Sequence, residues 1–230
     1  MGAAGAIGGP SGPAALGAAP ELAFAVDGVE ALRPAAAPTL RFALAIDAAG
    51  AAIRSVVLDV QIRISATQRA YAADEQEALA ELFGAPSRWG ETLRSLPWLQ
   101  TTLVVPPFDG ATVAHLDVPC TYDFEVGAAQ YLTALRDGVV PLELLFSGTV
   151  FDLSDDGRLR ASRISWEREA TCALPVAVWR AAIETRFPGS AWIRLDRAAF
   201  DRLAAFKARH ALTSWEATVE ALVDGAEGRP

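Results

Sequence analysis

Residues 39–65 read TLRFALAIDAAGAAIRSVVLDVQIRIS, and apolar side chains alternate with polar or small ones through both ends of this stretch. The alternating apolar residues are Leu40, Phe42, Leu44 and Ile46 in the first run and Val56, Leu58, Val60, Ile62 and Ile64 in the second. A period of two over so many positions predicts half-buried antiparallel strands at 39–47 and 53–65. Between them, Asp47-Ala-Ala-Gly50 is typical of a turn, so we expect a β-hairpin that joins the two strands.

The same alternation continues on both sides of this stretch. The further predicted strands cover residues 21–29, 100–105, 111–125, 139–153 and 158–168. Asp155-Asp-Gly157 predicts a tight turn between the last two.

Helical periodicity interrupts the strands at residues 74–96. Asp74-Glu-Gln-Glu77 has the spacing of a capping box and opens a helix that Gly84 ends. A second short helix is expected to hold Trp89, Leu93 and Leu96. These two helices form a helical insert between strands, and another short helix is predicted over 127–136.

From residue 174 to residue 224 the period becomes helical. Pro175 suits the first turn of a helix, and Pro188-Gly189 ends it. Asp196 caps a second helix, and Thr213-Ser-Trp-Glu216 has the capping-box spacing that opens a third. The apolar stripe of the first helix is Val176, Trp179, Ile183 and Phe187. Strands followed by helices predict an α+β fold, an antiparallel β-sheet or sandwich with a helical insert and C-terminal helices, in a single domain over 21–224.

Composition excludes several classes of protein. The 230 residues carry a net charge of −8, which disfavours nucleic-acid binding, and no apolar run is long enough to cross a membrane. Two Cys and two His are too few for a disulfide scaffold or a multi-ligand zinc module. Residues 1–20 are almost all Gly, Ala and Pro, so we expect a disordered tail rather than a signal peptide, and a cytoplasmic protein with reduced thiols.

Catalytic signatures are sparse. No phosphate-binding loop and no G-x-S-x-G elbow occurs in the sequence. Cys120 lies near His115 and Asp117, but strand parity places it on the opposite face unless Pro119 inserts a bulge. The carboxylates of Asp117, Asp123 and Glu125 share one parity and are typical of a solvated strand face. We therefore predict no catalytic, cofactor-binding or metal-binding residue, with an enzyme that uses Cys120 as the alternative.

Two sets of residues are candidates for binding a protein partner. The first is apolar and lies in the helical insert: Trp89, Leu93 and Trp98. The second is basic: Arg158, Arg160 and Arg163. Residues 158–209 hold 11 basic and 5 acidic residues within an acidic chain, so this block either pairs inside the fold or meets an acidic partner.

Several stretches resemble an uncharacterised actinobacterial family of unknown function. They read RAYAADEQEALAELFGAPSRW from Arg69, VPCTYDFEVGAAQYLTALRDGVVPLELLFSGTVF from Val118, and LPVAVWRAAIETRFPGSAWIRL from Leu174. Genes of that family are often met beside nickel–iron hydrogenase genes. The resemblance therefore implies an accessory or assembly role, with hydrogenase components as partners, and it implies no catalytic residue.

A weaker resemblance, at the level of fold, is to the export chaperone SecB. PLELLFSGTVFD from Pro141 is similar to its late strand, and AAFDRLAAFK from Ala198 to the start of its terminal helix. The sequence thus favours a non-enzymatic, protein-binding accessory factor in the cytoplasm. The alternatives are a SecB-like holdase and a small enzyme that uses Cys120.

Overall fold

The computed structural model describes residues 20–120, 126–186 and 195–228. The chain divides into two compact units, Met1–Pro188 and Gly189–Pro230, where one domain over 21–224 was expected. We call their described parts the β-unit and the helical unit, and describe each by itself. The predicted tail at 1–20 lies, except for Pro20, outside the described residues. No helix among the described residues is long and apolar enough to cross a membrane.

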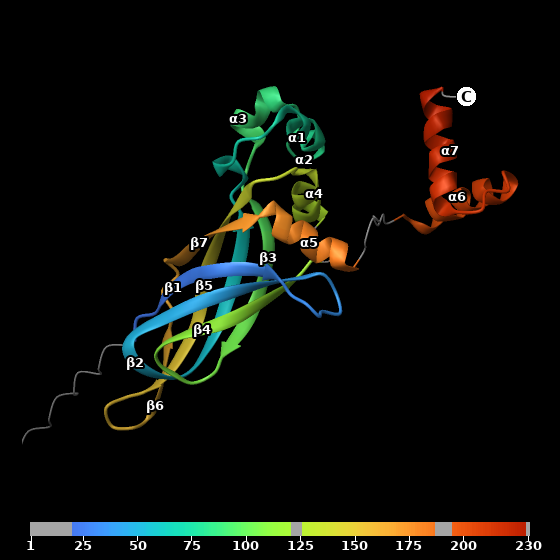
Figure 1. Ribbon diagram of the computed structural model, residues 1–230. Coiled ribbons are helices and arrows are strands. Elements are labelled where there is room, and N and C mark those ends of the chain that lie inside the picture. The colour runs from blue at the N-terminus through green and yellow to red at the C-terminus, as the bar shows by residue number, and fades with distance from the viewer. Residues whose placement is uncertain (1–19, 121–125, 187–194, 229–230) are drawn as a thin grey trace, which may run out of the picture. The chain divides into compact units, whose positions relative to one another are not determined.

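A single strand, β2 (Thr39–Ile64), is the spine of the β-unit (Figure 1). Its first half pairs with β1 (Ala23–Ala31) and β4 (Phe108–Pro119), and its second half with β3 (Leu96–Val105) and β5 (Val139–Leu153). The predicted hairpin at Asp47–Gly50 is therefore wrong, because the two halves pair with different strands and the residues between them make a corner. The strand predicted at 111–125 ends at Pro119, and its remainder at 121–125 lies outside the described residues.

The corner in β2 has a local cause. Ala49 and Gly50 both have positive φ, 51° and 84°, and the Asp47 carboxylate accepts a hydrogen bond of 2.8 Å from the Ala49 N–H. Between the pairs Asp47 with Ala111 and Ala52 with Asp109, β4 passes the corner with Gly110 alone. The extra residues of β2 bend the strand as a bulge does.

Two more strands complete an antiparallel, seven-stranded sheet. The first part of β5 pairs with β7 (Arg168–Pro175), and its last part with β6 (Leu159–Arg163). The single strand predicted at 158–168 is thus β6 followed by a loop and the first residue of β7. Pro175 ends β7 rather than lying in a helix, and α5 (Val176–Arg186) begins directly after it.

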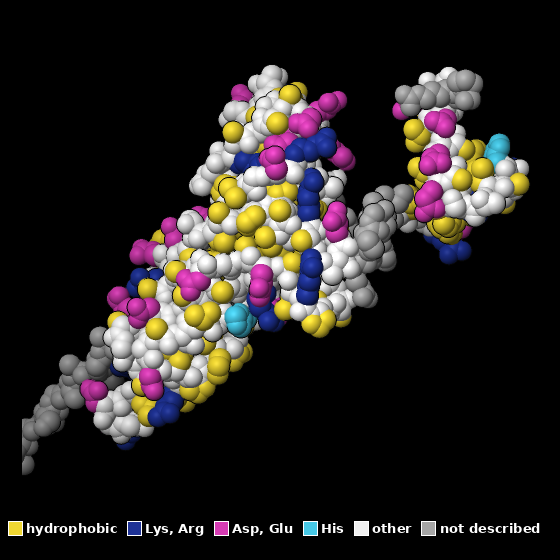
Figure 2. All heavy atoms as spheres, in the orientation of Figure 1, with side chains coloured by type: hydrophobic (Ala, Val, Ile, Leu, Met, Phe, Trp, Pro, Cys, Tyr) yellow, Lys and Arg dark blue, Asp and Glu magenta, His cyan; other side chains and the backbone are white. Residues whose placement is uncertain are grey.

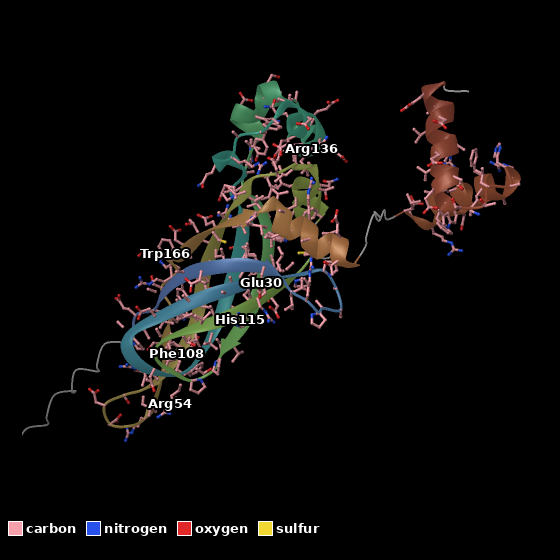
Figure 3. The ribbon with its side chains drawn as sticks, in the orientation of Figure 1. Glu30, Arg54, Phe108, His115, Arg136 and Trp166 are labelled. Atoms are coloured by element: carbon pink, nitrogen blue, oxygen red, sulfur yellow. The ribbon has the colours of Figure 1, made fainter. Side chains whose placement is uncertain are left out.

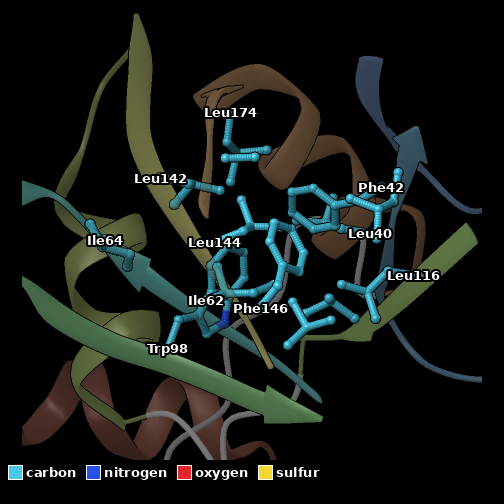
Figure 4. Close-up of a cluster of buried hydrophobic side chains, with 14 of the residues drawn as sticks. Leu40, Phe42, Ile62, Ile64, Trp98, Leu116, Leu142, Leu144, Phe146 and Leu174 are labelled. Atoms are coloured by element: carbon cyan, nitrogen blue, oxygen red, sulfur yellow. The ribbon is translucent and has the colours of Figure 1, made fainter. Parts of the chain in front are cut away.

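Side chains from β2, β3, β4, β5 and β7 meet in one apolar core, around which the sheet curls (Figure 4). Phe24 of β1 stacks on Phe146 of β5 at 4.3 Å between ring centroids, and Phe42 of β2 meets the edge of Trp98 of β3 at 6.4 Å. On β2 the even-numbered side chains of residues 40–48 and 56–64 point inward, as the alternation predicted, whereas at the corner the odd-numbered Ile53 is the buried one. Trp179 of α5 is also buried in this core, which docks α5 on the β-unit.

The helical insert consists of short turns rather than two full helices. They are η1 (Ala66–Gln68), α1 (Ala73–Ala78), α2 (Ala80–Phe83), η2 (Pro86–Arg88) and α3 (Trp89–Thr92). Leu93 follows α3, and Leu96 is the first residue of β3, so the insert is shorter than expected. Its first helix starts after Ala72, whose N–H donates to the Glu75 carboxylate at 3.1 Å, and not at Asp74. The helix predicted at 127–136 is α4 (Val126–Ala134).

The helical unit holds α6 (Arg197–Arg209) and α7 (Trp215–Glu227). Asp196 caps α6 as predicted and accepts from the Ala199 N–H at 2.7 Å. The cap of α7 is Ser214, one residue after the predicted position. The break predicted at Pro188-Gly189 lies outside the described residues. Strands in the first part of the chain and helices in the last confirm the α+β fold with an antiparallel sheet.

Candidate functional site

An open groove of about 600 Å³ lies on the β-unit where β5 changes its pairing partner. Its lining residues are Ser147, Gly148, Thr149, Arg163, Ile164, Ser165 and Trp166. Trp166, labelled in Figure 3, lies between β6 and β7 and is 80% exposed. An indole left this far in water is unusual, because burial of so large an apolar ring is strongly favourable.

The groove exists because the edge of β5 is covered by two different strands. β7 pairs with β5 as far as Phe146, and β6 pairs with it from Thr149 onward. Gly148 lies at the gap between them with φ +136°, and its carbonyl accepts a hydrogen bond of 3.0 Å from the Ile164 N–H. This bond holds the β6–β7 loop, and with it Trp166, over the gap.

The chemistry of the groove suits a protein segment. Trp166 supplies exposed apolar surface above the buried Ile164, and Arg163 supplies an exposed positive charge. Hydroxyl groups come from Ser147, Thr149 and Ser165. Trp and Arg are the residues that most often dominate protein interfaces. This combination favours a partner segment that carries an apolar and an acidic side chain.

The structure separates the three predicted basic residues. Arg160 forms an ion pair with the buried Asp152, and its Nε donates to that carboxylate at 3.1 Å. Arg158 lies in the turn before β6 and pairs with Asp156 at 3.4 Å. Only Arg163 lines the groove, because alternation along β6 turns Arg160 to the other face.

The structure also separates the apolar residues predicted in the insert. Trp98 is only 5% exposed and packs on Phe42, so its indole is in the core and its assignment as a surface contact is corrected. Trp89 is half-buried, packs edge-on against Tyr71 at 5.3 Å, and donates its indole N–H to the Gly84 carbonyl at 2.9 Å. Leu93 is partly buried against the same core. Partner binding through Trp89 and Leu93 stays a prediction.

Trp166 is the residue that sequence reasoning missed. The sequence holds no signal for it: Trp166 follows Ile164 at strand spacing within the strand predicted at 158–168, and alternation alone does not tell which residues of a strand stay exposed.

The residues considered for catalysis do not converge. Cys120 is 7% exposed, whereas His115 and Asp117 lie on the outer face of β4. Arg41 of β2 donates two hydrogen bonds of 2.7 Å to Asp117 and holds the pKa of that carboxyl below its usual value. Asp123 and Glu125 lie outside the described residues. Within the described part of the chain, no group of three or more His, Cys, Asp or Glu side chains is placed to hold a metal ion.

We expect both thiols of the native protein to alkylate slowly. Cys120 is buried, and burial raises the pKa of the Cys172 thiol, so less of it is thiolate at neutral pH. Iodoacetamide at about pH 7.5 should modify each at least about tenfold more slowly than free cysteine, measured by mass spectrometry of the digested protein. The urea-unfolded chain, in which both should react at the ordinary rate, is the control. Native Cys120 reacting faster than free cysteine would favour the enzyme.

The protein thus has an α+β fold with an antiparallel sheet, and its groove contains an exposed tryptophan and an arginine. The chain belongs to the family of unknown function DUF6084, whose model matches residues 19–230. A search of curated proteins finds no match.

Two solved structures of a β-glucosidase from Kluyveromyces marxianus, one in complex with glucose, are similar to 68% and 67% of this chain. Sequence identity is 9% and 7%, and the TM-scores are 0.24 and 0.26. This chain covers 15% of the length of that enzyme. A likeness this low carries no argument about fold or activity.

Proposed function

We propose that this protein is a non-enzymatic accessory or assembly factor that binds another protein through the groove beside Trp166. The observation that carries the proposal is the 80% exposure of Trp166 next to Arg163 in a groove that is part of the strand architecture. We also propose a cytoplasmic location, in which the two free thiols of Cys120 and Cys172 would stay reduced.

The energetic argument starts from the free protein. Because the Trp166 ring is already in water, covering it with a partner removes apolar surface that folding left uncovered. The Arg163 guanidinium adds direction, since it favours a carboxylate at one side of the bound segment. Trp166 is therefore expected to be the anchor, and Arg163 the residue that selects acidic partners.

The first partners to test are nickel–iron hydrogenase components. Support for this choice is the resemblance to a family whose genes are often met beside hydrogenase genes. The chemistry of the groove limits the choice of partner to components that expose an extended segment with neighbouring acidic and apolar residues.

Trp166→Ala should weaken binding to such a component without loss of stability. A hot-spot tryptophan contributes about 2 kcal/mol or more, so the dissociation constant should rise at least about 30-fold. The free energy of unfolding should change by no more than about 0.5 kcal/mol, because the side chain is exposed. Binding is measured by calorimetric titration with purified components, and stability by urea unfolding.

Leu159→Ala is the matched control, because Leu159 is an exposed apolar residue of β6 outside the groove. It should bind like the unchanged protein. Equal affinity of Trp166→Ala and Leu159→Ala would remove the groove from the proposal. If no purified hydrogenase component binds, the proposal of hydrogenase partners is wrong. If the protein suppresses the aggregation of an unrelated unfolded protein, the SecB-like alternative is favoured.

A further inference from the structure

The helical unit leaves most of its apolar side chains uncovered. On α7, Trp215, Val219, Leu222 and Val223 are 40–47% exposed, and Phe200 of α6 is 40% exposed. Among the described residues 195–228, only Thr218 is buried. These apolar residues follow one another at helical spacing, so they form a continuous stripe rather than scattered positions.

Such a pair of helices is poorly stable without a further surface. Each helix has 13 residues, about the length at which an isolated helix in water is only marginal. The Phe200 and Trp215 rings contact each other at 5.4 Å between centroids, yet both stay exposed on their outer sides. A contiguous uncovered apolar stripe of this kind marks a contact surface.

The charges of the two helices are opposite. α6 carries four basic residues and one acidic one, and α7 carries four acidic residues and no basic one. The acidic residues are Glu216, Glu220, Asp224 and Glu227, which follow one stripe along α7. In Figure 2 these magenta carboxylates run along α7 with yellow apolar side chains beside them. The surface of the helical unit is therefore complementary to a copy of itself.

A groove on this unit matches the acidic helix. It measures about 420 Å³ and is lined by Ala199, Arg202, Leu203, Ala205, Phe206, Arg209 and Leu222. Leu203, Phe206 and Leu222 give it an apolar lining, and Arg202 and Arg209 add two positive charges to that lining. An amphipathic helix with neighbouring apolar and acidic stripes fits this chemistry, and α7 of a second copy is such a helix.

We propose that the helical unit is a dimerisation element, in which the α6–α7 pairs of two copies pack about a two-fold axis. The α7 helix of each copy lies against the α6 groove of the other, so that the apolar stripes meet and Arg202 and Arg209 face Glu220 and Asp224 of the second copy. Two-fold symmetry makes both contacts identical and closes the assembly at two copies. Because two short helices offer only a small area, we expect micromolar affinity.

The first test is the mass of the full chain by light scattering on a sizing column. A dimer at about 100 µM that dissociates on dilution is expected. Val223→Asp, which places a charge on the half-exposed stripe, should give monomers at the same concentration with unchanged helical circular dichroism. A monomeric unchanged chain at about 100 µM would overturn the proposal.

The second test uses charge reversal in two separate chains. One variant carries Arg202→Glu and Arg209→Glu, and the other carries Glu220→Arg and Asp224→Arg. Each alone juxtaposes like charges across the proposed interface, so each should dimerise at least about tenfold more weakly. Mixed in equal amounts, they should form a heterodimer, because each reversed helix then meets an oppositely charged one.

Rescue on mixing requires contact between two chains, so a change confined to one chain cannot produce it. Arg94→Glu with Arg158→Glu, which reverses the same number of exposed charges on the β-unit, is the control and should dimerise normally. Two variants that keep their helicity but form no heterodimer would overturn the proposal. So would slow hydrogen exchange along α7 in the Val223→Asp monomer, since the stripe would then be covered within its own chain.

Discussion

Gly148→Ala should destabilise the β-unit by about 3–5 kcal/mol, more than any other single methyl group added to the sheet. Gly148 has φ +136°, a region that side chains other than hydrogen rarely enter. It also faces the backbone of β2, so an added Cβ would clash with the Val57 carbonyl oxygen and lie 3.1 Å from the Val57 carbonyl carbon. A backbone neighbour in the middle of a sheet cannot move away as a flexible side chain can.

The expected loss is measured as the shift in the free energy of unfolding by urea. Gly157→Ala is the matched control, because Gly157 also has positive φ, +77°, but an added Cβ there meets nothing within 4 Å. It should cost only about 1 kcal/mol, the price of the left-handed backbone alone. Equal effects at the two positions would show that β2 yields to the new methyl group. Gly148→Ala should also disorder the Trp166 groove, because the Gly148 carbonyl holds the β6–β7 loop through its hydrogen bond from the Ile164 N–H.

Glu75→Gln should cost about 3–5 kcal/mol although it removes only a charge and preserves the shape of the side chain. Glu75 and Arg69 are 3% and 9% exposed, and their ion pair is 2.8 Å long. Glu75 also accepts a hydrogen bond of 2.8 Å from the Arg136 N–H, while Arg69 donates to the carbonyls of Asp137 and Val139. The pair thus fastens the insert to the segment between α4 and β5. Without the carboxylate, the guanidinium stays buried with no opposite charge.

The neighbouring residue provides the control. Asp74 pairs with Arg136 at the same distance, 2.8 Å, but these side chains are 52% and 69% exposed. Solvent weakens such a pair, so Asp74→Asn should cost less than about 1 kcal/mol in the same urea experiment. If Glu75→Gln lowers the free energy of unfolding no more than Asp74→Asn does, the insert opens locally and lets water reach Arg69.

The sequence alone was enough to predict elements whose side chains repeat with a clear period and whose ends carry turn or cap residues. β5 begins at Val139 and ends at Leu153 as predicted, because inward apolar residues alternate from Val140 to Phe146 and again at Val150, and Gly138 precedes the strand. Asp196 identified the start of α6 because a carboxylate there satisfies a free N–H of the first turn. These features depend on interactions between residues close in the chain.

Features decided by distant residues could not be predicted in this way. Asp47–Gly50 suits a hairpin and a corner equally well, and only pairing with β1 and β4 on one side and β3 and β5 on the other made it a corner. β7 was missed because its short pattern runs directly into Pro175 and α5, and its strand character comes from pairing with β5.

The candidate site shows the same division. The sequence alone predicted an apolar set with Trp89 and Trp98 near the helical insert, and it showed that basic residues cluster around residue 160. Only the tertiary structure decided that Trp98 is buried against Phe42 while Trp166 stays in water, and that Arg160 is neutralised by Asp152 while Arg163 borders the groove. The physical reason is that burial and charge pairing are set by whatever other strands lie opposite a side chain, and in this curled sheet those strands come from remote parts of the chain.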